Sequence, residues 1–491
     1  MLKDVLSDNR LLASKAIEKA IDADIQSPTK AKAKEGLRYY KGDHDILQYK
    51  LIYIDSEGRV REEKHRSNIK IEHRFHTELV DQKVQYLLSN PVQIETEDEK
   101  LKAALTPYMG EEFQELLQDL LEGASNKGQE YVYTYKNETG KMSFQVADSL
   151  GVIQIYDDQD RNKLIGILRY YEVYVKDKKG EDVKVIKAEV WTDKNTTYYA
   201  QEPGKTTYKF EDDLIPNPKP HIVLEDDKAI YDGGGLGYIP FFRLMNNKEG
   251  STDLEPIKSL VDDYDLMACS LSNNLQDFQE AIYVVKGYNG TDFDSLIQNV
   301  KSRKVVGVDE NGSIDVKTVD IPTEARKVKL GLDKEAIYKF GMGFDSSQVG
   351  DGNITNIVLK SRYSLLDLKC NKTERKLRSL IRKLLKVIID DINAASGTAY
   401  DYSTPEIKIT REMMVNEDNL VSNAKTDAET ASIKIANVLL APISEESKLQ
   451  LICEILGLDF EEEKGKLEAE GPYQVDEALA AQLQGGGVIA E

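Results

Sequence analysis

Residues 353–393 form the longest stretch of helical periodicity in the sequence, and this stretch constrains the fold more than any other feature. The pattern predicts one long helix, which at 1.5 Å per residue would be on the order of 60 Å long. Its apolar residues recur every three or four positions, so we expect one side of the helix to pack and the other to face outward. The apolar positions are Leu377, Leu380, Ile381, Leu384, Leu385 and Ile388.

The same helix concentrates positive charge. Between positions 356 and 386 ten Lys and Arg residues stand against two acids, Asp367 and Glu374, a net charge of +8 within a chain of net charge −21. Such a face repels itself unless something anionic lies opposite, either the protein's own acids or a phosphate backbone. The pattern alone leaves both interpretations open. A preceding predicted helix, residues 324–340, adds further cations: Arg326, Lys327, Lys329, Lys334 and Lys339.

Length and composition limit the number of structural units and the kinds of partner that the chain can have. With 491 residues, we expect two to four structural units, because a single core rarely serves so long a chain. The strong negative charge argues against indiscriminate binding to nucleic acid or to an anionic membrane over the whole surface. Cys269, Cys370 and Cys453 each lie in an apolar helical pattern, which favours buried thiols in a reducing cytoplasm. The start MLKDVLSDNR and the lack of an apolar run of about 18 residues predict a soluble, unprocessed chain with no membrane segment.

The first part of the chain reads as α+β. Residues 1–130 are expected to be mainly helical, with one clear helix at residues 73–88 that ends before Ser89-Asn90-Pro91. From Glu130 to Phe210 alternating segments such as EYVYTYKN, GVIQIYDD and IGILRYYEVYV predict an antiparallel meander. IPNPKPH at residues 215–221 is an extended connector, because its prolines cannot donate to a sheet.

The later part alternates helices with short strands. Thr252-Asp253-Leu254-Glu255 has capping-box spacing, so a helix is expected from there to Glu280. The next four segments predict a strand, a helix and two more strands, which together would form a small α/β module. They are AIYVVKG, DFDSLIQNVKSR, KVVGVD and SIDVKTVD. The loop GFDSSQVGDGNIT and the long helix follow. After them PEIKITRE predicts a strand, and helices are expected over residues 420–456. The acidic, Gly-rich end of the chain is expected to be mobile.

Motifs for catalysis and metal binding are weak. GGGLG at residues 233–237 lacks the spacing of a phosphate-binding loop, and the Asp-rich DDYD and DDQD lack calcium-loop spacing. His73 and His76 lie three apart, but no neighbouring Cys or suitably spaced acid completes a metal site, so a polar helix face is the simpler interpretation. No nucleophile pairs with a base. We therefore expect no enzymatic activity, no catalytic residue, no metal and no cofactor.

The order of these parts, together with several phrases, resembles the portal proteins of tailed bacteriophages, in particular the family typical of siphophages of Gram-positive hosts. The resemblance covers residues 37–456. It is carried by RYYKGDHDIL, by VDQKVQYLLSNPVQI, and by GYIPFFRLMNN followed by DLEPIKSLVDDYDLMACSLSNNLQDFQEAIYVVKGY. One departure is that Thr355-Asn356 precedes the long helix where many relatives have Ser-Gly.

The resemblance implies an α+β multidomain portal fold that forms rings. Its parts would be a wing (residues 1–250), a first stem helix (251–280), an α/β clip (281–323), a second stem helix (324–340) and a tunnel loop (341–356). A long kinked helix with a returning wing strand (357–420), an α-helical crown (421–456) and an acidic, disordered tail (457–491) would follow. The chain would be a virion component at one capsid vertex, assembled in the host cytoplasm as a dodecameric homo-oligomer, for packaging and ejection of double-stranded DNA without sequence preference.

The resemblance also implies partners and site residues. The terminase large subunit, which would supply the work, and a head-completion adaptor would dock at the clip, and the wing would contact the major capsid and scaffold proteins. The tunnel-loop residues that would face the DNA are Ser346, Ser347, Gln348, Val349, Gly350, Asp351, Gly352, Asn353 and Thr355. The basic faces comprise Lys334, Lys339, Lys360, Arg362, Lys369, Lys372, Arg375 and Lys376, and the clip docking residues are Asn289, Asp292, Asp294, Lys301, Arg303, Asp309 and Asn311.

Two alternatives from other classes stay open on the residues alone. A metal-dependent nuclease acting on DNA would need acidic ligands that converge on the basic helix. A non-viral oligomeric scaffold would form rings without a basic constriction.

Overall fold

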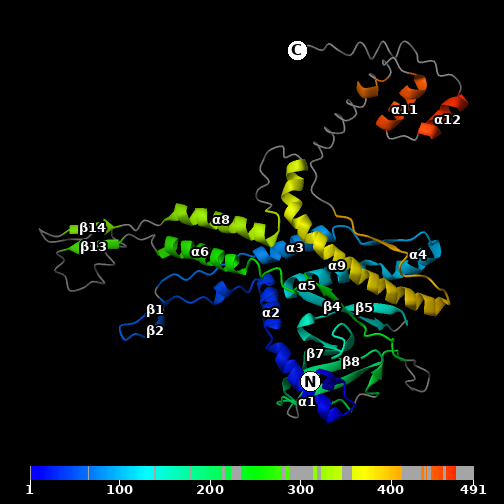
Figure 1. The fold of residues 1–491 in the computed structure, drawn as a ribbon. Helices are drawn as coiled ribbons and strands as arrows, with labels where there is room; N and C mark the ends of the chain where they lie inside the picture. Colours follow the sequence, from blue (N-terminus) through cyan, green and yellow to red (C-terminus); the bar gives the residue numbers. More distant parts are fainter. Residues whose placement is uncertain are drawn as a thin grey trace, which may run out of the picture. The chain divides into compact units, whose positions relative to one another are not determined.

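A computed structural model gives the architecture of the chain. It describes residues 2–64, 66–137, 140–176, 180–212, 216–222, 234–277, 282–286, 313–317, 322–345, 356–411, 433–435, 438, 444–456 and 460–470. The chain divides into two compact units, Met1–Ser346 with Tyr363–Glu412, and Ser347–Arg362 with Met413–Glu491. The described residues mix helices with small antiparallel sheets, as the α+β prediction requires (Figure 1).

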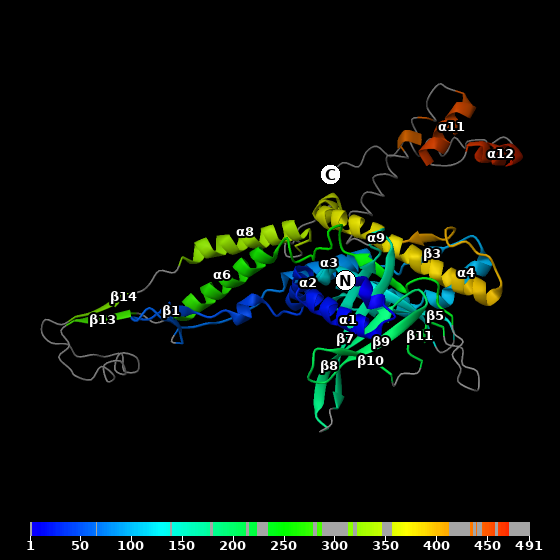
Figure 2. The same ribbon diagram turned by 60° about the horizontal axis from the view of Figure 1, so that its bottom comes forward.

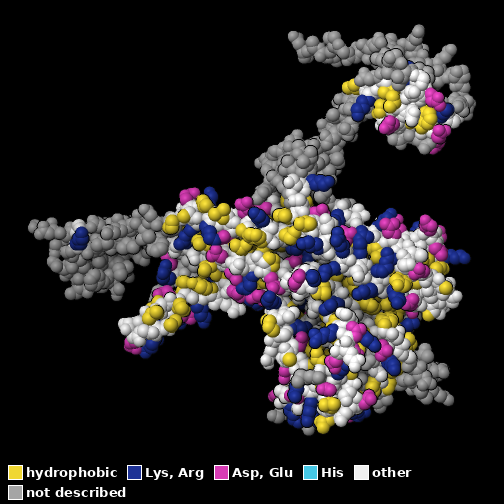
Figure 3. Space-filling view, viewed as in Figure 1, with side chains coloured by type: hydrophobic (Ala, Val, Ile, Leu, Met, Phe, Trp, Pro, Cys, Tyr) yellow, Lys and Arg dark blue, Asp and Glu magenta, His cyan; other side chains and the backbone are white. Residues whose placement is uncertain are grey.

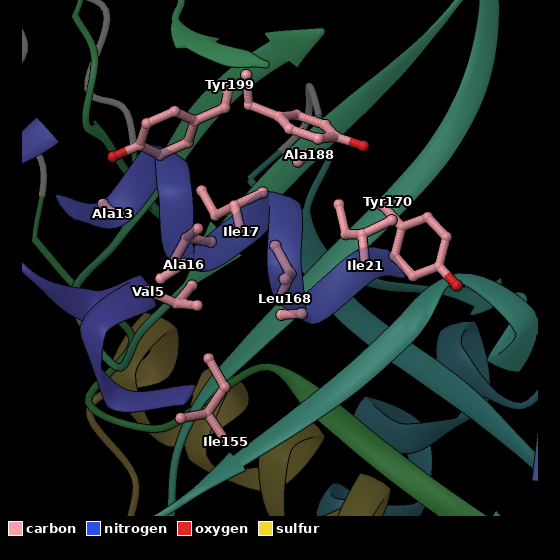
Figure 4. Packing of buried hydrophobic residues seen from close by; sticks show 13 residues of the cluster. Val5, Ala13, Ala16, Ile17, Ile21, Ile155, Leu168, Tyr170, Ala188 and Tyr199 are labelled. Atoms are coloured by element: carbon pink, nitrogen blue, oxygen red, sulfur yellow. The ribbon is translucent and has the colours of Figure 1, made fainter. Parts of the chain in front are cut away.

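The predicted meander is present, and a helix covers it. Strands β6 (Val152–Tyr156), β7 (Leu164–Lys176), β8 (Asp182–Trp191), β9 (Asn195–Gln201) and β10 (Tyr208–Phe210) pair antiparallel in chain order, and β11 (Lys219–Pro220) joins β9. Helix α1 (Arg10–Ile25), after the short helix η1 (Leu2–Leu6), is capped by the Asn9 side chain. Its Ile17 and Ile21 pack on Leu168 and Ala188 of the sheet (Figure 4). This contact forms one core of the first unit.

Strand β4 (Gln129–Lys136) does not belong to that meander, which corrects the prediction of one continuous meander from Glu130. It pairs instead with β5 (Met142–Ala147), a strand that the sequence analysis missed, and with β12 (Phe241–Met245). Since β12 lies more than a hundred residues later in the chain, no local pattern could have revealed this pairing. The three strands form a second sheet.

Helix α5 (Glu111–Lys127) packs on this sheet, and α2 (Pro28–Tyr40) and α3 (Phe75–Leu87) pack on α5. This part of the chain also contains α4 (Glu99–Leu105) and the short helices η2 (Asp45–Gln48), η3 (Thr106–Tyr108) and η4 (Ser149–Gly151). Helix α3 confirms the helix expected before Ser89. A hairpin, β1 (Ile52–Ile54) with β2 (Val60–Glu62), was not predicted, although its strands flank an Asp-Ser-Glu-Gly turn. Alternation over only three residues is too short to separate from noise.

Two antiparallel helices, α6 (Lys258–Asp277) and α8 (Thr323–Gly341), project from the rest of the first unit (Figures 1 and 2). The capping box is confirmed, since Thr252 N–H donates to Glu255 Oε1 at 3.0 Å and Glu255 N–H to Thr252 Oγ at 3.3 Å. Regular helix begins slightly later than predicted, at Lys258. Beyond the pair, β13 (Ile282–Lys286) and β14 (Ser313–Lys317) form an antiparallel sheet.

The long helix is α9 (Asn356–Ser396), three residues later at each end than predicted. All six residues of its expected apolar stripe are buried, which confirms that one side packs. After it, β15 (Glu406–Lys408) pairs with β3 (Gln93–Glu95), so the chain returns to the first domain.

In the second unit α11 (Glu445–Leu456) and α12 (Phe460–Glu470) are helical. Helix α12 corrects the prediction of a mobile tail from residue 457, and its three glutamates Glu461, Glu462 and Glu463 stand in the first turn, where they favour a helix through its dipole. The three cysteines are buried and unpaired, as expected. Among the described residues no helix is both long and apolar enough to cross a membrane.

We predict that Gly36→Ala destabilises the first unit by about 2 kcal/mol, because its new Cβ would lie 2.1 Å from the backbone oxygen of Asn126, where α2 meets α5. The matched control is Gly331→Ala in α8, another helix-interior glycine, which has nothing within 4 Å. This change should stabilise the protein slightly, since alanine favours helix. Thermal unfolding midpoints check both, and equal midpoints would contradict the close approach.

Candidate nucleic-acid interface

The exposed side of α9 carries a column of cations opposite its buried stripe. Lys372, Arg375, Lys383 and Lys386 are all exposed, and their spacings of three, eight and three residues keep them on one face of a helix. Lys376 lies at the margin of this column and is half-buried, and burial lowers its pKa. We call Lys372, Arg375, Lys383 and Lys386 the cationic column. Lys372 and Arg375 were predicted site residues, and the structure brings them together.

Other cations of this region neutralise the protein's own acceptors. Arg378 donates from Nε to Glu374 at 2.7 Å and from Nη1 to the carbonyl of Ile407 in β15. Arg382 donates to the carbonyls of Tyr402 at 3.0 Å and Pro405 at 2.6 Å. Asp367 and Glu374, the two acids between positions 356 and 386, are also engaged, because Arg411 pairs with both. The positive charges of this region therefore fall into two groups. Arg378, Arg382 and Arg411 bind residues 402–411 to α9, whereas the cationic column lies on the exposed face.

The remaining predicted basic residues differ in their surroundings. Lys334 on α8 pairs with Asp345 at 3.2 Å, whereas Lys339 is exposed. Lys360 is exposed, and the side chain of Arg362 lies outside the described residues. Lys369 points inward with 12% of its side chain exposed, and donates to the carbonyl of Gly341 at 3.0 Å. The charge of Lys369 therefore pairs with groups inside the protein and is not presented on the surface.

Lys369 is one member of a buried ionic cluster, which we call the ionic node. Lys83 of α3, which is 1% exposed, donates from Nζ to Asp253 Oδ2 at 3.0 Å, and Lys369 lies 3.1 Å from the same oxygen. Lys83 also donates to Ser125 Oγ at 2.9 Å and Asn246 Oδ1 at 2.5 Å, and the Asn246 amide donates to Asp253 Oδ1 at 2.8 Å. The node joins α3, α5, the end of β12, the segment before α6, the end of α8 and α9.

The electrostatics of the node favour an ionised Asp253. Burial alone would raise the pKa of Asp253, but the ammonium groups of Lys369 and Lys83 and the amide of Asn246 bring it well below the ordinary range. Burial lowers the pKa of Lys83, and the charge of Asp253 opposes that shift. The sequence analysis missed this cluster. Lys83 was a usable signal, since it interrupts the apolar pattern of Leu79, Val80 and Leu87 on α3.

A second feature that was missed is a backbone ladder along α6. Four alternate residues of the extended segment 67–73 donate their backbone N–H groups to side chains one helical turn apart on α6. The pairs are Ser67 with Asp277 at 3.0 Å, Ile69 with Asn273 at 2.6 Å, Ile71 with Cys269 Sγ at 3.2 Å, and His73 with Asp265 at 2.9 Å. Two extended residues advance about as far as one helical turn, so the register repeats.

Asp265 anchors the inner end of this ladder. Its carboxylate is buried and lies 2.8 Å from Nδ1 of both His44 and His73. Burial would raise the pKa of Asp265, but hydrogen bonds from the two histidines lower it. His73 and His76 thus occupy different surroundings, because His76 is fully buried and packs edge-on against Tyr40 at 6.4 Å.

All nine predicted tunnel-loop residues, from Ser346 to Thr355, lie outside the described residues, and so do all seven predicted clip docking residues, from Asn289 to Asn311. Those assignments stay predictions. The structure places the helices that flank the loop, α8 and α9, and the strands β13 and β14 that flank the clip residues in sequence.

Comparison with known proteins identifies relatives over most of the chain. Residues 21–470 match the family model described as phage portal protein, SPP1 Gp6-like. The portal protein of Bacillus phage SPP1 is 29% identical over 411 residues, which cover 83% of this chain and 78% of the relative. The portal protein of Clostridium phage phiCD119 is 27% identical over 395 residues, covering 77% of this chain and 82% of the relative.

We predict that Asp253→Asn destabilises the protein by about 3–5 kcal/mol, because it leaves two ammonium groups buried without a carboxylate. Lys83→Met should cost less, since Asp253 then keeps Lys369 as its partner. Asp263→Asn on α6, the helix that follows Asp253 in the chain, is the matched control: its exposed ion pair with Lys329 should contribute less than about 1 kcal/mol. Urea unfolding checks the order, and equal effects of Asp253→Asn and Asp263→Asn would contradict the node's role.

We further predict a pH dependence from His76. Burial lowers its folded-state pKa to about 4 from 6.5, so the unfolded state binds more protons between these values. The associated stability is fully present above about pH 6.5 and is lost as the pH falls toward 4, by about 3 kcal/mol in total. His76→Leu should flatten the urea-unfolding midpoint over this window. An unchanged slope in the variant would assign the pH dependence to other groups.

Proposed function

The chain belongs to the SPP1 Gp6-like family of phage portal proteins, and from this membership we propose that twelve copies close into a ring at one capsid vertex, through which double-stranded DNA enters and leaves. Portal function is the conclusion that the two relatives support. The observation that carries it is the extent of the family match, residues 21–470, which includes the long basic helix and the helices before it.

The domain assignment follows from this membership and is part of the proposal. The wing would comprise residues 1–250, the clip residues 281–323, and the crown residues 421–456. The α6–α8 pair would be the stem, which is supported by its antiparallel packing and by the β13–β14 sheet between the two helices in sequence. Pairing of β15 with β3 supports a return of the chain to the wing after α9.

The proposed DNA contact is weak and independent of sequence. A conduit must let DNA slide, and each phosphate that the wall neutralises strengthens binding and steepens its salt dependence. The cationic column supplies four exposed charges per subunit, while Arg378, Arg382 and Arg411 are engaged with the protein's own oxygens. A strongly acidic chain with one restricted basic face would guide DNA without holding it.

We propose that the chain acts as a structural component of the virion rather than as an enzyme. The terminase large subunit would supply the work of packaging and dock at the clip, a head-completion adaptor would later take that place, and capsid and scaffold proteins would contact the wing. A nuclease would need free carboxylates beside the basic helix. Three of the four acids of α9 are paired, Asp367 and Glu374 with Arg411 and Asp391 with Lys136, which favours the structural role over this alternative.

The tunnel loop would be the part that follows the moving DNA. We predict that replacing Gly350 and Gly352 by proline leaves rings intact and lowers the DNA packaged per head, because proline fixes φ where glycine adapts. The matched control replaces the same two residues by alanine, which restricts the backbone less and should reduce packaging less. Ring formation is checked by electron microscopy and packaging by nuclease-protected DNA. Normal packaging by the proline variant would contradict the loop assignment.

A further inference from the structure

The β1–β2 hairpin has an apolar face that the rest of the described chain leaves uncovered. Ile52, Ile54 and Val60 are 66%, 72% and 66% exposed. The register sets Ile54 opposite Val60 and Ile52 opposite Glu62, so the three aliphatic side chains share one face, while Tyr53 and Arg61 share the other. An isolated two-stranded hairpin is marginally stable in water. A hairpin with this face therefore needs a surface to pack against.

Helix α8 has a matching uncovered stripe. Val328, Leu332 and Phe340 are 61%, 59% and 57% exposed. Val328 and Leu332 lie one helical turn apart, and Phe340 lies about 80° further round the helix, at the margin next to the buried face. That buried face contains Asp333 and Ile337 and packs on α6. Figure 3 shows apolar side chains along α8 and along the hairpin.

One chain cannot bring these two surfaces together. The hairpin and α8 lie on opposite sides of α6 in both views (Figures 1 and 2). The segment that follows β2 is held along α6 by the backbone ladder, from Ser67 on Asp277 to His73 on Asp265. Two different surfaces on opposite sides of one subunit are what a head-to-tail contact between copies requires, and such contacts generate rings when the rotation closes.

Charge also favours a second copy as the occupant. Between Ile52 and Glu62 the hairpin has three acids against two bases, whereas α8 has five bases against three acids. The apolar face of the hairpin carries one carboxylate, Glu62, and Lys339 is an exposed ammonium beside the stripe on α8. Opposite net charges at the rim of an apolar contact favour encounter and fix its register.

We propose that the hairpin face of Ile52, Ile54 and Val60 packs against the Val328, Leu332 and Phe340 stripe of a neighbouring copy. The inference rests on the proposed ring and names one contact that closes it. The contact links helix α8 of one subunit to the β1–β2 hairpin of the next. Since it lies outside the ionic node and the cationic column, changes to it should affect assembly without altering the fold of a single chain.

The test compares two substitutions with a matched control. Ile54→Lys and Leu332→Lys should each raise the protein concentration needed for half-assembly at least about tenfold, because each buries a charge in an apolar contact. Tyr53→Lys, on the opposite face of the same hairpin, should assemble like the wild type. Mass photometry over a dilution series measures assembly, and circular dichroism checks that each variant stays folded. Wild-type levels of assembly by both Ile54→Lys and Leu332→Lys would overturn the inference.

A crosslinking experiment identifies the neighbour directly. Ile54→Cys with Leu332→Cys in one chain should give a ladder of covalent oligomers with a short bismaleimide, since the native cysteines are buried. Tyr174→Cys with Leu332→Cys, which moves one thiol to the exposed Tyr174 of β7, should give no ladder. No ladder from the first pair in a wild-type-like ring would overturn this contact alone. A wild-type chain that never forms rings would instead contradict the proposed function.

Discussion

The structure depends on one buried interaction, the ionic node of Lys83, Asp253 and Lys369. Burying charges costs several kcal/mol per ion unless geometry and hydrogen bonds compensate, so the node is stable only when all of its partners are in place. Those partners come from α3, α5, the end of β12, the segment before α6, the end of α8 and α9. The relative positions of these elements therefore depend on one shared ionic cluster, and the backbone ladder ties the segment 67–73 to α6.

This arrangement explains how an acidic protein can pack its long basic helix against the rest of its first unit. Lys369 forms an ion pair with Asp253, and Arg378 and Arg382 donate hydrogen bonds to backbone carbonyls of residues 402–407, so these charges stabilise the fold. What remains exposed is the column from Lys372 to Lys386. Some cations of the basic helix thus pair with the protein's own acceptors, and the others lie on its exposed face, where Lys386 Nζ is 5.5 Å from the centroid of the Tyr402 ring.

Much of the secondary structure follows from the sequence, and most of the tertiary pairing does not. The apolar stripe from Leu377 to Ile388, the capping box at Thr252 and the end of α3 are local patterns, and each was predicted. Two contacts join residues more than a hundred positions apart: the pairing of β12 with β4 and the hydrogen bond of Lys83 to Asp253. Local periodicity cannot predict contacts of this kind. Lys83 and the polar column Asp265, Cys269, Asn273 and Asp277 were visible signals, but their partners were not. Of the predicted basic residues, Lys372 and Arg375 are exposed on one side of α9, whereas the side chain of Lys369 is internal, and their contact with DNA stays a prediction.

The most direct test of the account is an electron cryo-microscopy map of the purified, assembled protein. The account predicts a closed ring in which the side of α9 bearing Lys372, Arg375, Lys383 and Lys386 faces the central opening, with the ionic node intact behind it. A ring in which this side faces outward, or single chains under every condition of salt and concentration, would contradict it.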